Sequence, residues 1–151
     1  LGDVYKRQVS MLMSVVKAMG GVDMLVDGLT SIMTDHLVAP VMALASGVLS
    51  WFSSTTGVVM PTLIPTVPEI LQTFPSASYS AVVSGITMTS FLAAFSPAST
   101  GGAGIMAQYA IFNQEAGEKD TNKLFIRLFL TSVVSVAIST LLAAVGLYKI
   151  F

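Results

Sequence analysis

Two short hydroxyl-rich segments carry the side chains best suited to bind a polar solute. The first is Trp51–Pro61, in which four consecutive hydroxyl residues precede Gly57, and the second is Phe95–Gly104, with the sequence FSPASTGGAG. Hydroxyl groups donate hydrogen bonds to anions and can also ligate sodium, and glycine lets a solute approach the backbone. Neither segment contains a fixed charge. Binding there would therefore depend on hydroxyl groups and backbone dipoles.

Other kinds of chemistry find little support in the residue types. The chain has one histidine and no cysteine, which excludes disulfides and thiolate metal sites and disfavours most histidine-based catalytic groups. The hydroxyl segments have no neighbouring base that would activate a nucleophile, so we do not expect an enzyme. The net charge of −1 gives no indication of nucleic-acid binding. No organic cofactor is expected.

The composition predicts an all-α integral membrane protein. Of the 151 residues, 54% are hydrophobic and only 10% are charged, and the mean hydropathy is +0.80. A soluble domain usually carries about 25% charged residues. We expect residues 1–8 to be a non-native tail. Residues 9–34 should hold the tail of a truncated helix followed by an amphipathic helix at the membrane interface, because Asp23 and Asp27 lie four residues apart among apolar neighbours.

Residues 35–151 are predicted to hold three membrane elements, beginning with a helical hairpin at residues 37–67. The first apolar run, Leu37–Phe52, covers roughly 24 Å as a helix, which is short of a hydrocarbon core of about 30 Å. A re-entrant hairpin that turns at Ser53–Gly57 is therefore favoured. The alternative is one long span kinked by proline.

A broken helix is predicted next, at residues 79–112. Pro97 lacks an amide hydrogen and two glycines follow it, so we expect helices at Tyr79–Phe95 and Ala103–Phe112 with unwound backbone between them. Such backbone is tolerated at membrane depth only where it is buried or lines a wet cavity. An unbroken terminal span should follow at residues 123–151. The basic residues of the Asn113–Lys123 loop predict a cytoplasmic location for that loop in a multi-pass inner-membrane protein.

The candidate site residues come from the two hydroxyl-rich segments. The returning half-helices should present free amide groups and the positive end of a dipole, which suit a carboxylate. The unwound carbonyl groups suit a small cation. The predicted substrate-binding residues are Ser53, Ser54, Thr55, Thr56, Ser99, Thr100 and Gly101. The predicted cation-binding residues are Ser53, Thr55, Gly57, Ser96, Ala98 and Thr100.

The chain resembles the C-terminal part of a member of the ion transporter superfamily, of the divalent-anion:sodium symporter and malonate-carrier type. The resemblance covers Val9–Phe151 and depends on the order of an amphipathic arm helix, a hairpin, a broken helix and a last span. Residues Ser53–Thr55 match a Ser-Asn-Thr hairpin tip, with Ser54 in place of asparagine. The segment Ser96–Gly102 falls on the unwound loop that in relatives is often Pro-Pro-Asn-like, and without that asparagine it resembles the loop of the malonate-carrier branch.

This resemblance implies an inverted-repeat secondary transporter in which residues 35–151 form part of the transport domain. A second hairpin and broken helix would lie upstream. It also implies cation-coupled uptake of small dicarboxylates, such as C4-dicarboxylates or malonate, in a homodimer within the lipid bilayer. The missing asparagines leave sodium and proton as alternative coupling ions. The competing hypothesis is a non-transporting membrane scaffold or subunit in which the Ser/Thr/Gly segments only pack helices together.

Overall fold

Helices make up the ordered secondary structure of this chain. The computed structural model describes residues 11, 14, 15, 18–113 and 117–150, and these residues contain no strand. The prediction of an all-α fold is therefore confirmed for them. Helix α2 (Gly21–Thr30) corresponds to the predicted interfacial helix, while residues 1–8 and most of the predicted helix tail before it lie outside the described residues.

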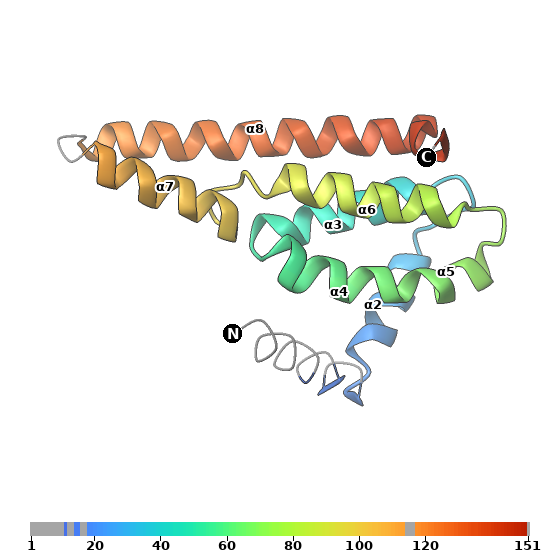
Figure 1. Cartoon of the computed structure of the whole chain (residues 1–151). Coiled ribbons are helices and arrows are strands. Elements are labelled where there is room, and N and C mark those ends of the chain that lie inside the picture. The colour runs from blue at the N-terminus through green and yellow to red at the C-terminus, as the bar shows by residue number, and fades with distance from the viewer. Residues whose placement is uncertain (1–10, 12–13, 16–17, 114–116, 151) are drawn as a thin grey trace.

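A helical hairpin follows α2. Its first arm is α3 (Val38–Trp51), and after three non-helical residues the chain reverses and returns beside α3 (Figure 1). The second arm is helical from residue 55 to residue 73. It consists of η1 (Thr55–Val59), α4 (Met60–Leu63), η2 (Ile64–Thr66) and α5 (Val67–Thr73).

Three prolines divide this second arm into pieces but do not end it. Pro61, Pro65 and Pro68 each lie in the first two positions of α4, η2 and α5. Proline has no amide hydrogen to donate, and the first turn of a helix does not need one. The expected end of the hairpin at residue 67 was therefore too early, because the arm continues for six more residues to Thr73.

The next element is interrupted and continues as a second helix. Helix α6 (Tyr79–Ala93) is followed by six non-helical residues and then by α7 (Thr100–Phe112) (Figure 1). The second half was expected to begin at Ala103. It begins at Thr100 because the Ser99 side chain accepts a hydrogen bond from the Gly102 amide and caps the helix.

The long helix α8 (Glu118–Val145) runs back along α7 and α6 (Figure 1). It starts five residues before the expected residue 123. It ends well before the expected residue 151, because Gly146 has a φ of 82° and turns the chain into η3 (Leu147–Ile150). Among the described helices, α8 is the one that is long and apolar enough to cross a membrane. Of its most apolar 18-residue segment, 22% is buried in the structure.

The main core lies between α3, the second hairpin arm and α6. Met42, Leu63 and Ile86 come from these three elements and are fully buried. On its other side α3 approaches α8 closely, because Gly47 presents no side chain. A Cβ atom at Gly47 would lie 2.8 Å from Val136 Cγ1. Small residues thus permit the close contact of α3 with α8.

Hydroxyl groups tie α6 to the helices on both sides. Each of these groups is buried and bonds to a carbonyl or hydroxyl of another helix, which satisfies its hydrogen-bonding capacity in an apolar setting. The pairs are Ser46 Oγ with Ile86 O at 3.1 Å, Ser132 Oγ with Ala93 O at 3.1 Å, and Thr89 Oγ1 with Ser139 Oγ at 2.7 Å. Helix α6 is thereby held against both α3 and α8.

Candidate functional site

The tip of the hairpin and the break between α6 and α7 lie against each other. The hydroxyl of Ser96, in the break, donates a hydrogen bond of 3.0 Å to the carbonyl oxygen of Trp51, at the end of α3. The Trp51 ring in turn packs on the Phe129 ring of α8, with ring centroids 5.9 Å apart. Two segments that are about 40 residues apart in the sequence are therefore joined in one place.

A pocket of about 220 Å³ opens where these segments meet. It is smaller than the sites of drug-sized ligands, which have volumes of about 300–1,000 Å³. Four consecutive residues of the hairpin tip line one side, and residues from the end of α6 and the start of α7 line the other. The lining residues are Ser53, Ser54, Thr55, Thr56, Phe91, Ala94, Thr100 and Gly101.

The two helices that start at this pocket have the same type of cap. Ser54 has an extended backbone, and its hydroxyl accepts a hydrogen bond of 3.1 Å from the Gly57 amide. Ser99 is also extended, and its hydroxyl accepts a bond of 3.1 Å from the Gly102 amide. Serine is among the preferred N-cap residues because it satisfies one free amide of the first turn. The remaining first-turn amides of both helices are positioned beside the pocket.

The close fit of the break depends on Gly102. A Cβ atom at this position would collide with the carbonyl group of Ser96. The Ser99 hydroxyl lies 2.6 Å from Ala94 O and 2.7 Å from Ser96 O, so it bonds both the end of α6 and the break itself. The unwound segment is therefore held by backbone contacts and by one serine side chain.

Beneath the hairpin tip, three oxygen atoms form a buried cluster. Ser50 Oγ lies 2.7 Å from Thr55 Oγ1, and both hydroxyls lie within 2.9 Å of Ser90 O, at 2.7 Å and 2.9 Å respectively. Two hydroxyl protons serve three oxygen–oxygen contacts, so neither hydroxyl has a proton left for a solute. This cluster attaches the hairpin tip to α6.

The predicted substrate-binding residues therefore divide into two groups. Six of the seven line the pocket, but Ser99 is buried and acts as the helix cap. Thr55 is 6% exposed, and its hydroxyl is occupied in the buried cluster. The hydroxyls of Thr56 and Thr100 are exposed and make no hydrogen bond to the residues that the structure describes. The Ser54 hydroxyl accepts a bond from the Gly57 amide and donates none to the described residues, so Ser54, Thr56 and Thr100 are the free hydroxyl donors of the pocket.

The six predicted cation-binding residues are not gathered around one point. Ser53, Thr55 and Thr100 line the pocket, whereas Gly57 and Ser96 are buried outside its lining. Ala98 is exposed, and its amide lies 3.4 Å from Ser96 Oγ. Within the described part of the chain, no group of three or more His, Cys, Asp or Glu residues could hold a metal ion.

Several residues of this site were not predicted from the sequence. Ser50 and Ser90 belong to the buried cluster, and Phe91 and Ala94 line the pocket. A signal for Ser50 was present, since Ser46 and Ser50 lie four residues apart on one face of an apolar helix and are both fully buried. No comparable sequence pattern indicates Phe91 or Ala94, because they belong to the pocket only through their position at the end of α6.

The electrostatics of the pocket come from backbone dipoles. As far as the described residues show, its lining contains no charged side chain. The N-terminal ends of two helices lie beside it, and such ends carry roughly half a positive charge each.

Comparisons with known protein families, with characterised proteins and with solved structures gave no match to this chain. The site is therefore interpreted from its own geometry.

Proposed function

We propose that this chain is part of a secondary active transporter that carries small organic dianions, of the C4-dicarboxylate or malonate type, across a membrane. The observation that carries the proposal is the pocket where a hairpin tip meets a helix break, with two serine-capped helix starts beside it. Broken helices that present their N-terminal ends to an anionic substrate are a recurring feature of secondary transporters.

The chemistry of the pocket suits a carboxylate better than a cation or a neutral solute. Free first-turn amides of two helices and the hydroxyls of Thr56 and Thr100 are all hydrogen-bond donors. An anion in this position would gain from both helix dipoles without a charged side chain. A carrier needs a site that also releases its solute, and this lining leaves no fixed counter-charge in the pocket when the solute departs.

The apolar surface of the molecule supports placement in a multi-pass inner-membrane protein. Most of the apolar α8 surface is exposed, with Leu141 65% and Val145 83% accessible. Large exposed apolar surfaces are rare on soluble monomers and mark contact with lipid or protein. Helix α3 has 14 residues and spans about 21 Å. This is shorter than a hydrocarbon core of about 30 Å, so the hairpin would be re-entrant.

The resemblance to the ion transporter superfamily completes the proposal. An upstream repeat of inverted topology would supply a second hairpin and break facing this one, and the carrier would act as a homodimer. The coupling ion would be sodium or a proton. Unwound carbonyl groups of the hairpin tip and of the break are the kind of ligand that such an ion takes.

Removal of single hydroxyls tests the substrate assignment. In the complete carrier, Thr56→Val and Thr100→Val should each lower the kcat/KM for dicarboxylate uptake into proteoliposomes roughly 10- to 100-fold. A hydrogen bond to a charged group is worth about 1.5–3 kcal/mol. The matched control is Thr131→Val, an exposed position on α8 outside the pocket lining. Uptake at the level of the control in both pocket variants would refute the substrate site.

The scaffold hypothesis remains the rival, because many buried hydroxyls of this chain bond neighbouring helices. Ser46 and Ser132 are examples, and packing alone explains them. In a scaffold, the pocket hydroxyls would have no solute to bind. Thermal unfolding of the complete carrier with and without dicarboxylate and sodium separates the two hypotheses, since only a carrier would be stabilised by its solute.

A further inference from the structure

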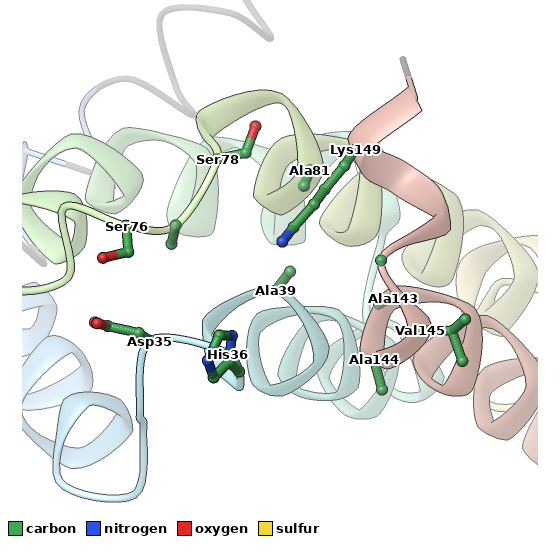
Figure 2. Close-up of a pocket in the computed structure, with 12 residues that line it drawn as sticks. Asp35, His36, Ala39, Ser76, Ser78, Ala81, Ala143, Ala144, Val145 and Lys149 are labelled. Carbon is green, nitrogen blue, oxygen red and sulfur yellow. The ribbon is translucent and has the colours of Figure 1, made fainter.

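A second cavity lies at the opposite end of α6 from the pocket described above. It has a volume of about 140 Å³ and is enclosed by the turns before α3 and α6, the end of α8, and η3 (Figure 2). Its polar lining residues are Asp35, His36, Ser76, Ser78 and Lys149. This cavity belongs to neither hydroxyl-rich segment, and the transport proposal does not use it.

The position of Lys149 is set by the fold of the chain end. Gly146 has a φ of 82°, which residues other than glycine rarely adopt, and it turns the chain back after α8. Tyr148 is then buried, and its hydroxyl lies 2.7 Å from Ser139 Oγ. Lys149 follows Tyr148 directly, and its side chain reaches into the cavity in the direction of Ala39 (Figure 2). The ammonium group is therefore presented by an anchored segment.

The charged groups of this cavity are not paired with each other. Within the described part of the chain the salt bridge is Lys123–Asp120, and Asp35 and Lys149 form none. In Figure 2 they lie on opposite sides of the cavity. The start of α6 lies on the lysine side, and its cap residue Ser78 makes no side-chain cap bond. The cavity thus has a positive and a negative side.

The walls of the cavity leave room for a ligand and adjoin an apolar surface. Ala39, Ala81 and Ala143 contribute only methyl groups to the lining. Val145 also lines the cavity and is 83% exposed, and Leu141 lies one turn earlier on α8 and is 65% exposed. Hydrocarbon chains could lie along α8 while a polar group enters the cavity.

We propose that this cavity binds phosphoethanolamine, as the headgroup of an aminophospholipid. The phosphate lies at the Lys149 ammonium and the first turn of α6, with His36 as a further donor, and the ethanolamine ammonium lies at Asp35. A zwitterion satisfies both unpaired charges, whereas a simple anion would leave Asp35 facing it. The inference rests on α8 lying in a bilayer, but it does not require that the protein transports a solute.

The test compares lipids that differ in one part of the headgroup. The protein is purified in a mild detergent, and its thermal unfolding is followed with added phosphatidylethanolamine, phosphatidylcholine, phosphatidylglycerol or free phosphoethanolamine. The trimethylated choline cannot donate a hydrogen bond to a carboxylate, and phosphatidylglycerol has no ammonium. We expect phosphatidylethanolamine to raise the unfolding temperature the most. Free phosphoethanolamine should have a smaller effect at equal concentration, because it lacks the acyl chains that contact α8.

Variants connect this preference to the cavity. Lys149→Met and Asp35→Asn should each weaken the apparent affinity for phosphatidylethanolamine about three- to fivefold, the range for a partly exposed charge pair. The matched control is Lys119→Ala, which removes one exposed positive charge at the other end of α8 and should change nothing. If Lys149→Met does not fold, Lys149→Arg serves instead, and it should keep the lipid preference.

Each alternative result overturns a part of the inference. An equal response to all three lipids, or an unchanged response in both cavity variants, refutes the headgroup site. The parent protein could show no preference for ethanolamine, and Asp35→Asn could bind phosphatidylglycerol more tightly. These two results together would identify a plain anion site instead. Equal stabilisation by free phosphoethanolamine and by the lipid refutes the lipid as the source. None of these results depends on uptake, so the transport proposal fails or stands separately.

Discussion

Substitution of Gly102 by alanine is the most direct test of how the helix break is built. An added Cβ would overlap the carbonyl carbon and oxygen of Ser96 and come within 2.8 Å of Pro97 Cα. These are backbone atoms, so no side-chain rotation can relieve the overlap. The backbone of Ser96 and Pro97 must therefore move away from α7, which disturbs the bond from the Ser99 hydroxyl to Ser96 O and with it the cap of α7.

The magnitude follows from three contributions. Forcing an extra methyl group into a packed site costs about 1–3 kcal/mol, and disturbance of a serine cap costs about 0.5–2 kcal/mol. Alanine in place of glycine within a helix recovers up to about 1 kcal/mol. The net destabilisation is then about 2 kcal/mol. For a chain of this size, that lowers the unfolding temperature by about 4–8 °C.

Gly104→Ala provides a control with the opposite sign. Gly104 lies in the same helix, two residues away, and a Cβ there would meet nothing within 4 Å. Only the helix-propensity gain remains, and it should raise the unfolding temperature by about 1–4 °C. Both variants are measured by thermal unfolding in the same detergent. Equal shifts in the two variants would refute the described packing of Gly102 against the break.

Two further substitutions test the packing of α6 and α8. Gly47→Ala should destabilise the protein by about 1–3 kcal/mol in chemical unfolding, because its Cβ would lie 2.8 Å from Val136 Cγ1; a neutral effect would mean that α3 and α8 are farther apart. Thr89→Val should cost about 0.6 kcal/mol through the lost 2.7 Å bond to Ser139. A double-mutant cycle with Ser139→Ala checks this, and a coupling energy of zero would contradict the bond.

Local sequence information determined where the helices break. Ser54 and Ser99 are each followed three residues later by glycine, and Pro97 cannot donate an amide hydrogen. These are properties of single residues and their near neighbours, so they could be recognised without a structure. The segments at Ser53–Gly57 and Ser96–Gly102 were located by their hydroxyl residues, glycines and proline, and both helix starts lie there in the structure.

Helix ends were predicted less well, and for the second hairpin arm this is because neighbouring elements decide where it ends. The second hairpin arm continues past Pro65 and Pro68, since α3 and α6 bury its residues Val67 and Ile70 in the core. Burial against these helices outweighs the local signal of the prolines. The ends of α8 are different: its first turn is exposed, and its last residue, Val145, precedes the left-handed Gly146, so local capping sets them.

The sequence by itself determined that this chain is helical, rich in apolar surface, and broken at two hydroxyl-rich segments. Only the tertiary structure decided that these breaks meet, that the Thr55 hydroxyl is turned inward to Ser90 O, and that Thr56 and Thr100 keep free hydroxyls. The physical reason is the distance along the sequence between the groups that make the deciding contacts. Caps and breaks depend on contacts within six residues along the chain, whereas the direction of the Thr55 hydroxyl depends on a carbonyl 35 residues away.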